Sequence, residues 1–242
     1  SADISAIINT SLLPITTSSY INSNKTNDSI KIFQPKLFSI FCFKDNSVYF
    51  SGGKLSKENL SCLSKLSFSA ERSCISNSEE FEFTFKLTTL PPMNYPRSSH
   101  AMIWSHEEEN LIVIGGAHTK TCEVFNISKQ EWFELPELPQ YSPNPSLCIH
   151  EDNLFCFNAG AEYNSFEGIY VLSMKNFKKI YIEKARGFSS GLWEDMNYRF
   201  LFKGGRLKKS MAAVSYCNNG GSSILLLGGY DHDRSYYDVL EL

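Results

Sequence analysis

The sequence is punctuated by short apolar runs that end in two adjacent glycines. The clearest run is Leu111–Ile114, which is followed directly by Gly115 and Gly116. Four large aliphatic residues without polar alternation suit a strand that is covered on both faces. The glycines allow positive φ and a close backbone approach at the end of that strand. This combination predicts the inner strand of a packed array of strands.

Segments of strand length flank this run on both sides. Ser98–Trp104 precedes it across a polar turn, and Thr121–Ile127 and Glu131–Leu135 follow it. Pro136 and Pro139 end the unit because proline cannot donate a ladder hydrogen bond. Four short antiparallel strands in about 40 residues form a twisted four-stranded sheet, which is the blade of a β-propeller.

This unit resembles the kelch repeat. The resemblance lies in the double glycine, followed by Phe125 and, after six intervening residues, by Trp132. Kelch repeats usually have Tyr where this chain has Phe125, so the hydrogen bond of a tyrosine hydroxyl is expected to be missing. The resemblance implies an all-β fold, a kelch-type β-propeller of four-stranded antiparallel blades.

Other parts of the chain read as weaker copies of the same unit. The first blade is expected to contain Leu37–Phe43, Val48–Phe50, Ser61–Phe68 and Glu80–Leu87, with Gly52 and Gly53 after its inner strand. Residues Ser69–Glu79 between its outer strands are rich in Ser and Glu, so they are expected to form a surface loop.

The third blade is predicted from Ser146 to about Ile182, with its outer strand at residues 177–182. Ala159 replaces the first glycine before Gly160, and no Trp occupies the outer-strand position. The fourth blade is predicted to begin at Phe188 and to place Gly204 and Gly205 after its inner strand. Its evidence is register: Trp193 stands eleven residues before its glycine pair, as Trp104 and Phe41 do before theirs.

The fifth blade is predicted from two apolar runs joined by Asn219-Gly220, a strong hairpin signal, with Gly228 and Gly229 after the second run. The second glycines of the five units are separated by 63, 44, 45 and 24 residues. The last interval is too short for a blade, so either the fourth blade lacks its outer strands or a segment near Leu207 is absent. The second reading is favoured because half a blade would leave apolar edges uncovered.

The propeller is expected to occupy residues 29–242, after a polar tail at residues 1–28. Ser29–Phe33 is a lone strand candidate, and we assign it to the last blade, where it closes the ring. Five blades are recognisable, and a sixth is left open.

Composition and charge limit the classes of binding partner and the cellular compartment that fit this chain. A net charge of −3 gives no general attraction for nucleic acid or anionic lipid, and no apolar stretch is long enough to span a bilayer. The seven cysteines are an odd number in a domain too large to need disulfides, which predicts reduced thiols and a cytoplasmic location.

No pattern in the sequence predicts a catalytic, metal or cofactor site. The five histidines form no zinc-binding spacing, and His100 is expected to serve packing or hydrogen bonding. Asp231-His232-Asp233 is interpreted as a solvated loop, and the basic cluster near Gly204 as an exposed rim. Some kelch propellers, such as galactose oxidase, are copper enzymes, but the Cys and Tyr residues here do not match that pattern.

The kelch resemblance implies that the loops after the inner strands and between blades share one face, and that this face binds proteins. Arg97 could bond between blades or anchor an interface, and the two readings are weighed evenly. We therefore expect a non-catalytic protein-interaction scaffold or adaptor within a larger intracellular assembly, cytoskeletal or ciliary. The alternatives are the substrate-recognition propeller of a ubiquitin ligase and, ranked lower, a copper enzyme. The residues expected to contact a protein partner are His118, Lys120, Tyr163, Tyr230, His232, Arg234, Tyr95 and Tyr141.

Overall fold

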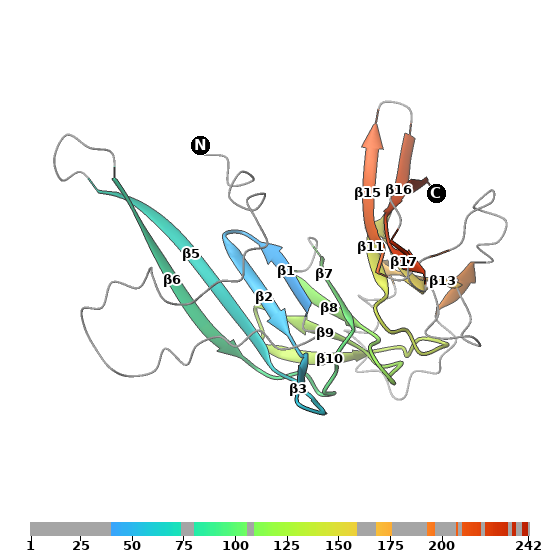
Figure 1. Cartoon of the computed structure of the whole chain (residues 1–242), viewed down its shortest axis with the longest axis horizontal. Helices are drawn as coiled ribbons and strands as arrows, with labels where there is room; N and C mark the ends of the chain where they lie inside the picture. Colours follow the sequence, from blue (N-terminus) through green and yellow to red (C-terminus); the bar gives the residue numbers. More distant parts are fainter. Residues whose placement is uncertain are drawn as a thin grey trace. The chain divides into compact units, whose positions relative to one another are not determined.

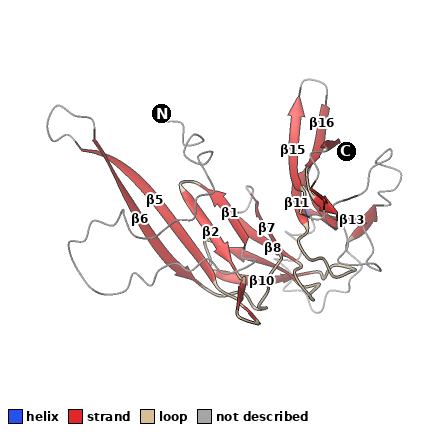
Figure 2. Ribbon diagram, in the orientation of Figure 1, coloured by secondary structure: helices blue, strands red, loops and turns tan. Residues whose placement is uncertain are grey.

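Apart from two helical residues at 174–175, the described elements of regular structure are β-strands joined by loops and turns (Figure 1, Figure 2). The computed structural model describes residues 40–73, 80–105, 109–158, 168–175, 193–196, 207, 210–218, 221–231, 234–235 and 239–241. Contacts divide the chain into Ser1–Gln34 and Pro35–Leu242, and every described residue belongs to the second unit. The expected tail at 1–28 and the expected closing strand Ser29–Phe33 lie outside the described residues.

The first sheet has the four strands expected of a blade. They are β1 (Ile40–Lys44), β2 (Ser47–Ser51), β5 (Leu63–Ser73) and β6 (Glu80–Leu90), in the order β1-β2-β5-β6. The expectation of a surface loop over Ser69–Glu79 is wrong for residues 69–73, and residues 74–79 lie outside the described residues. Residues 69–73 continue β5 and pair with β6 up to Ser73 opposite Glu80. The alternation of polar and aromatic residues along β6 suits an extended ribbon better than a loop.

The second sheet is confirmed strand by strand. β7 (Ala101–Ser105), β8 (Asn110–Ile114), β9 (Cys122–Asn126) and β10 (Glu131–Leu135) form an antiparallel meander in the order β10-β9-β8-β7. Every residue of β8 is buried, as its unbroken apolar character predicts.

The third sheet corrects the assignment of the fourth blade. Its strands are β11 (Ser146–His150), β12 (Asn153–Asn158), β13 (Gly168–Ser173) and β14 (Glu194–Met196). β14 pairs with β13 and is therefore the outer strand of this sheet, not the first strand of a new one. Residues 177–182, expected at that position, lie outside the described residues.

A tryptophan hydrogen bond explains why β14 belongs to the third sheet. Trp132 on β10 donates its Nε1–H to the carbonyl of Pro91, 2.8 Å away, in the connection that leads into the second sheet. Trp193, directly before β14, donates to the carbonyl of Pro136 at 2.9 Å, in the connection that leads into the third sheet. Trp193 is therefore the equivalent of Trp132, the tryptophan of the outer strand. Its spacing from the following glycine pair, which equals that of Trp104, led to the wrong assignment.

The fourth sheet contains the strands expected of the last unit. β15 (Ala212–Asn218) and β16 (Gly221–Leu227) form the predicted hairpin, and β19 (Val239–Glu241) pairs with β16. Two loops contain short hairpins that the sequence did not indicate. These are β3 (Lys54–Leu55) with β4 (Glu58–Asn59), and β17 (Tyr230–Asp231) with β18 (Arg234–Ser235).

Consecutive sheets pack on one another through three apolar clusters. One cluster joins the first two sheets and includes Tyr49, Leu63 and Trp104. A second joins the second and third sheets, and a third joins the third and fourth. Cys122, Cys148, Cys156 and Cys217 form no disulfide. In the described part of the chain, no helix is long and apolar enough to cross a membrane.

Candidate functional site: the loop face of the sheets

The double glycines form the joints between neighbouring sheets. The N–H of Gly53 donates to the carbonyl of Arg97 at 2.9 Å, and the N–H of Gly116 donates to the carbonyl of Ser142 at 3.0 Å. Arg97 and Ser142 each stand four residues before the first strand of the next sheet. A Cβ on Gly52 would lie 2.3 Å from the Arg97 carbonyl oxygen. The joint therefore requires glycine at this position.

The connections into successive sheets also share a backbone conformation. Ser99, Asn144 and Ser210 have φ values of 54°, 51° and 54°, and each stands two residues before the first strand of its sheet. This repeat identifies the connections into the second, third and fourth sheets as structural equivalents. Gly160, Gly204 and Gly205, which were also expected at strand ends, lie outside the described residues, whereas Gly228 and Gly229 have positive φ.

Arg97 is a buried link between the first two sheets. Its side chain has no exposed surface. Its guanidinium donates to the carbonyls of Gly115 and Thr121, at 2.8 and 2.7 Å, and to the Thr121 hydroxyl at 2.9 Å. It also pairs with the Glu123 carboxylate at 2.5 Å. Of the two readings weighed for Arg97, the structure supports bonding between blades.

Glu123 is a site residue that the sequence interpretation missed. Its carboxylate accepts from Arg97 and from the backbone N–H groups of Asn94 and Tyr95, at 2.7 and 3.2 Å respectively. A carboxylate with no exposed surface requires such partners. The available signal was a charged residue inside an otherwise apolar strand, β9, because such a residue is rarely buried unless it is paired.

His100 lies beneath the same joint and is a structural histidine. Its Nε2 is 2.7 Å from the Ser51 hydroxyl, and its side chain is almost completely buried. Burial, together with the nearby Arg97 charge, lowers the pKa of His100 to about 3. The imidazole is therefore neutral at physiological pH, as a packing and hydrogen-bonding role requires. Among the described residues, no three His, Cys, Asp or Glu side chains form a group that could hold a metal ion.

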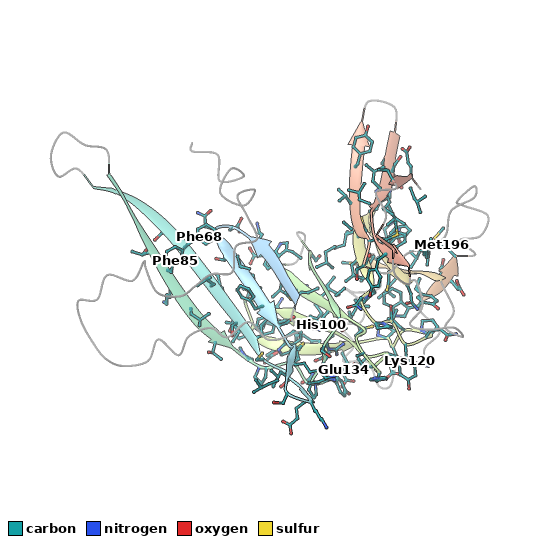
Figure 3. The ribbon with its side chains drawn as sticks, viewed as in Figure 1. Phe68, Phe85, His100, Lys120, Glu134 and Met196 are labelled. Carbon is teal, nitrogen blue, oxygen red and sulfur yellow. The ribbon has the colours of Figure 1, made fainter. Side chains whose placement is uncertain are left out.

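Two of the expected partner-binding residues lie together. The Lys120 ammonium is 3.0 Å from the Pro139 carbonyl and 5.5 Å from the centroid of the Tyr141 ring. The Tyr141 side chain is 57% exposed. His118 is exposed on the same loop as Lys120 and has a φ of 61°. Figure 3 shows Lys120 and Glu134 at the same end of the sheets.

Tyr95 lies beside the outer strand of the second sheet. Its hydroxyl donates to Glu134 at 2.7 Å, and this hydrogen bond, with the Glu134 charge, raises the pKa of Tyr95. The ring remains 38% exposed.

The other expected contact residues are separate or undescribed. Tyr230 is 38% exposed and begins the β17–β18 hairpin, whose second strand includes Arg234. Tyr163, His232 and the side chain of Arg234 lie outside the described residues.

Comparisons with known proteins find similarity at the level of structure. No family model matches the sequence, and no curated protein matches it. The fold matches the solved structure of YjhT, a kelch-repeat β-propeller protein, with a TM-score of 0.50 and 13% sequence identity. The match covers 86% of this chain and 81% of YjhT. The chain thus has an all-β, YjhT-like kelch propeller fold, as the glycine and aromatic pattern predicted.

Proposed function

We propose that the chain is a non-catalytic protein-binding module whose loop face receives a protein partner. The observation that carries this proposal is the pair formed by Lys120, from the connection between β8 and β9, and Tyr141, from the connection between β10 and β11. The pair presents an aromatic ring, more than half exposed, beside an ammonium group. Tyr is among the residue types that most often anchor protein interfaces.

Backbone hydrogen bonds hold these two connections in place. The N–H of Leu138 donates to the carbonyl of Lys120 at 2.9 Å, and the N–H of Gly116 donates to that of Ser142. Because the loops are fixed before binding, a partner would order few groups when it associates. A scaffold or adaptor role within an intracellular assembly fits this rigid display, with a cytoplasmic, cytoskeletal or ciliary location as part of the proposal.

Closure of the blades into a ring is also part of the proposal. We propose that Ser29–Phe33 supplies a fourth strand to the sheet β15-β16-β19, which has three strands among the described residues. Closure would fix the loops of all the blades on one face. The number of blades follows from where residues 176–192 and 197–206 belong.

The test is comparative capture of partners from the source cell. Tyr141→Ala and Lys120→Ala change the proposed face. Tyr216→Ala is the control, because Tyr216 is an exposed tyrosine on β15, with an exposed fraction of 39%. We expect partners that bind wild type and Tyr216→Ala to be lost with both loop variants. Equal recovery with all four proteins would remove the face from the proposal. Stoichiometric copper in the purified protein would favour the oxidase alternative instead.

A further inference from the structure

The hairpin formed by β5 and β6 extends beyond the sheet to which it belongs. β2 pairs with β5 only from Ser51 opposite Leu63 to Ser47 opposite Ser67. β5 and β6 continue to pair from there to Ser73 opposite Glu80. Figure 1 shows this two-stranded ribbon projecting past β2. Its outer half therefore lacks the support of the other strands of the first sheet.

The ribbon has one apolar and one polar face. Its register places Leu66 opposite Leu87 and Phe68 opposite Phe85, and Figure 3 shows Phe68 and Phe85 next to one another on it. Phe85 is 69% exposed and Leu87 is 47% exposed. Large apolar side chains at such exposure, on a projecting ribbon, are typical of an interaction surface.

β6 is also the edge strand of its sheet. The strand order ends with β6, and among the described strands none pairs with its outer side. An edge of eleven residues presents a row of backbone N–H and C=O groups that can pair with another strand. What selects that other strand is the charge pattern along β6.

The sequence of β6 is complementary to itself in antiparallel orientation. About a centre at Thr84, Lys86 lies opposite Glu82 of a second strand, and the symmetry repeats this pair. The same register sets Phe85 opposite Phe83 and Leu87 opposite Phe81, so that apolar residues meet on one face and charged residues on the other. Opposite charges and aromatic pairs directly across a sheet are stabilising.

The next possible register of two β6 strands lacks these charge pairs. Moving the centre to Phe85 would set Lys86 opposite Thr84 and remove both ion pairs. The register centred on Thr84 is therefore preferred.

We propose that two copies of this chain form a symmetric dimer by antiparallel pairing of their β6 strands, centred on Thr84. The pairing joins the two first sheets into one continuous sheet across the two-fold axis. It uses the edge of β6, which is distinct from the loop face that carries Lys120 and Tyr141.

The test is a charge exchange measured by sedimentation equilibrium of the 242-residue chain. Lys86→Glu places two glutamates opposite two glutamates, and Glu82→Lys places lysines opposite lysines. We expect each variant to weaken dimerisation by about tenfold or more, equivalent to about 1.4 kcal/mol. An equimolar mixture of the two variants should restore a mixed dimer, because each variant then supplies the charges that the other lacks. The double variant should restore the symmetric dimer.

Lys57→Glu is the matched control, since Lys57 is exposed in the turn between β3 and β4 and carries the same charge change. Circular dichroism checks that each variant is folded. A wild-type chain that remains monomeric at every accessible concentration would overturn the proposal. A dimer that tolerates both reversals, or folded single variants whose mixture fails to associate, would exclude this strand pairing and point to another surface.

Discussion

Replacing Arg97 tests whether the buried ion pair is the principal polar link between the first two sheets. Arg97→Met keeps an unbranched side chain of similar length but removes four hydrogen bonds and the charge that balances Glu123. Removing one partner of a buried pair costs about 3–5 kcal/mol. In a domain of this size, each kcal/mol lowers Tm by about 2–4 °C. We therefore expect Tm to fall by roughly 6–20 °C.

A double-mutant cycle separates the ion pair from packing. Glu123→Gln alone leaves the guanidinium without its carboxylate, and Arg97→Met with Glu123→Gln leaves neither charge buried. The double variant should be at least about 2 kcal/mol more stable than the sum of the single effects implies. Urea denaturation provides the free energies, and Lys57→Met serves as the exposed control. Simple additivity of the two changes, or an Arg97→Met variant as stable as the control, would refute the assignment of this clamp.

Three further predictions concern single side chains. Gly52→Ala should lower the free energy of unfolding by about 2 kcal/mol or more, clearly more than Gly221→Ala. Both positions have positive φ, but of the two only a Cβ at position 52 would meet a backbone oxygen. Thermal denaturation of the two variants compares these effects. Between pH 7 and pH 5, wild type should lose about 2 kcal/mol more stability than His100→Gln, since the unfolded imidazole takes up a proton that the folded one, with a pKa of about 3, does not; urea titrations at both pH values measure this. Trp193→Phe and Trp132→Phe should each cost about 1 kcal/mol in the same titrations, because each removes one indole hydrogen bond to a carbonyl, and an unaffected Trp193→Phe would contradict its place beside β14.

The fold was predictable where the residue pattern reports backbone requirements. Gly115 and Gly116 stand where positive φ and the approach of the next connection leave no room for a side chain. Phe125 on β9 packs against Trp132 on β10, with their ring centroids 5.0 Å apart. These constraints are local, so a single sequence expresses them, and the second sheet emerged with nearly correct strand boundaries.

The prediction failed where two placements satisfy the same local pattern. Trp193 matches the offset of Trp104 from a glycine pair, but its environment is that of Trp132, on the opposite edge of a blade. The difference lies in a hydrogen bond to Pro136, 57 residues away, and no local spacing encodes it. The pairing of Arg97 with Glu123 is non-local in the same way. In the sequence, the only sign of this pair was that a buried Glu123 carboxylate would need a positively charged partner. Several Lys and Arg residues could have been that partner.

The correction at Trp193 also removes the strongest reason to suppose that the chain lacks a segment near Leu207. With β14 assigned to the third sheet, the spacing that matters runs from Gly160 to Gly229, which is 69 residues. The spacing from Gly53 to Gly116 is 63 residues and contains the long β5–β6 hairpin. The two intervals are therefore similar in length. The fourth sheet packs against the third, because one apolar cluster joins the two sheets, and Ser210 has the same positive φ before the fourth sheet as Asn144 has before the third.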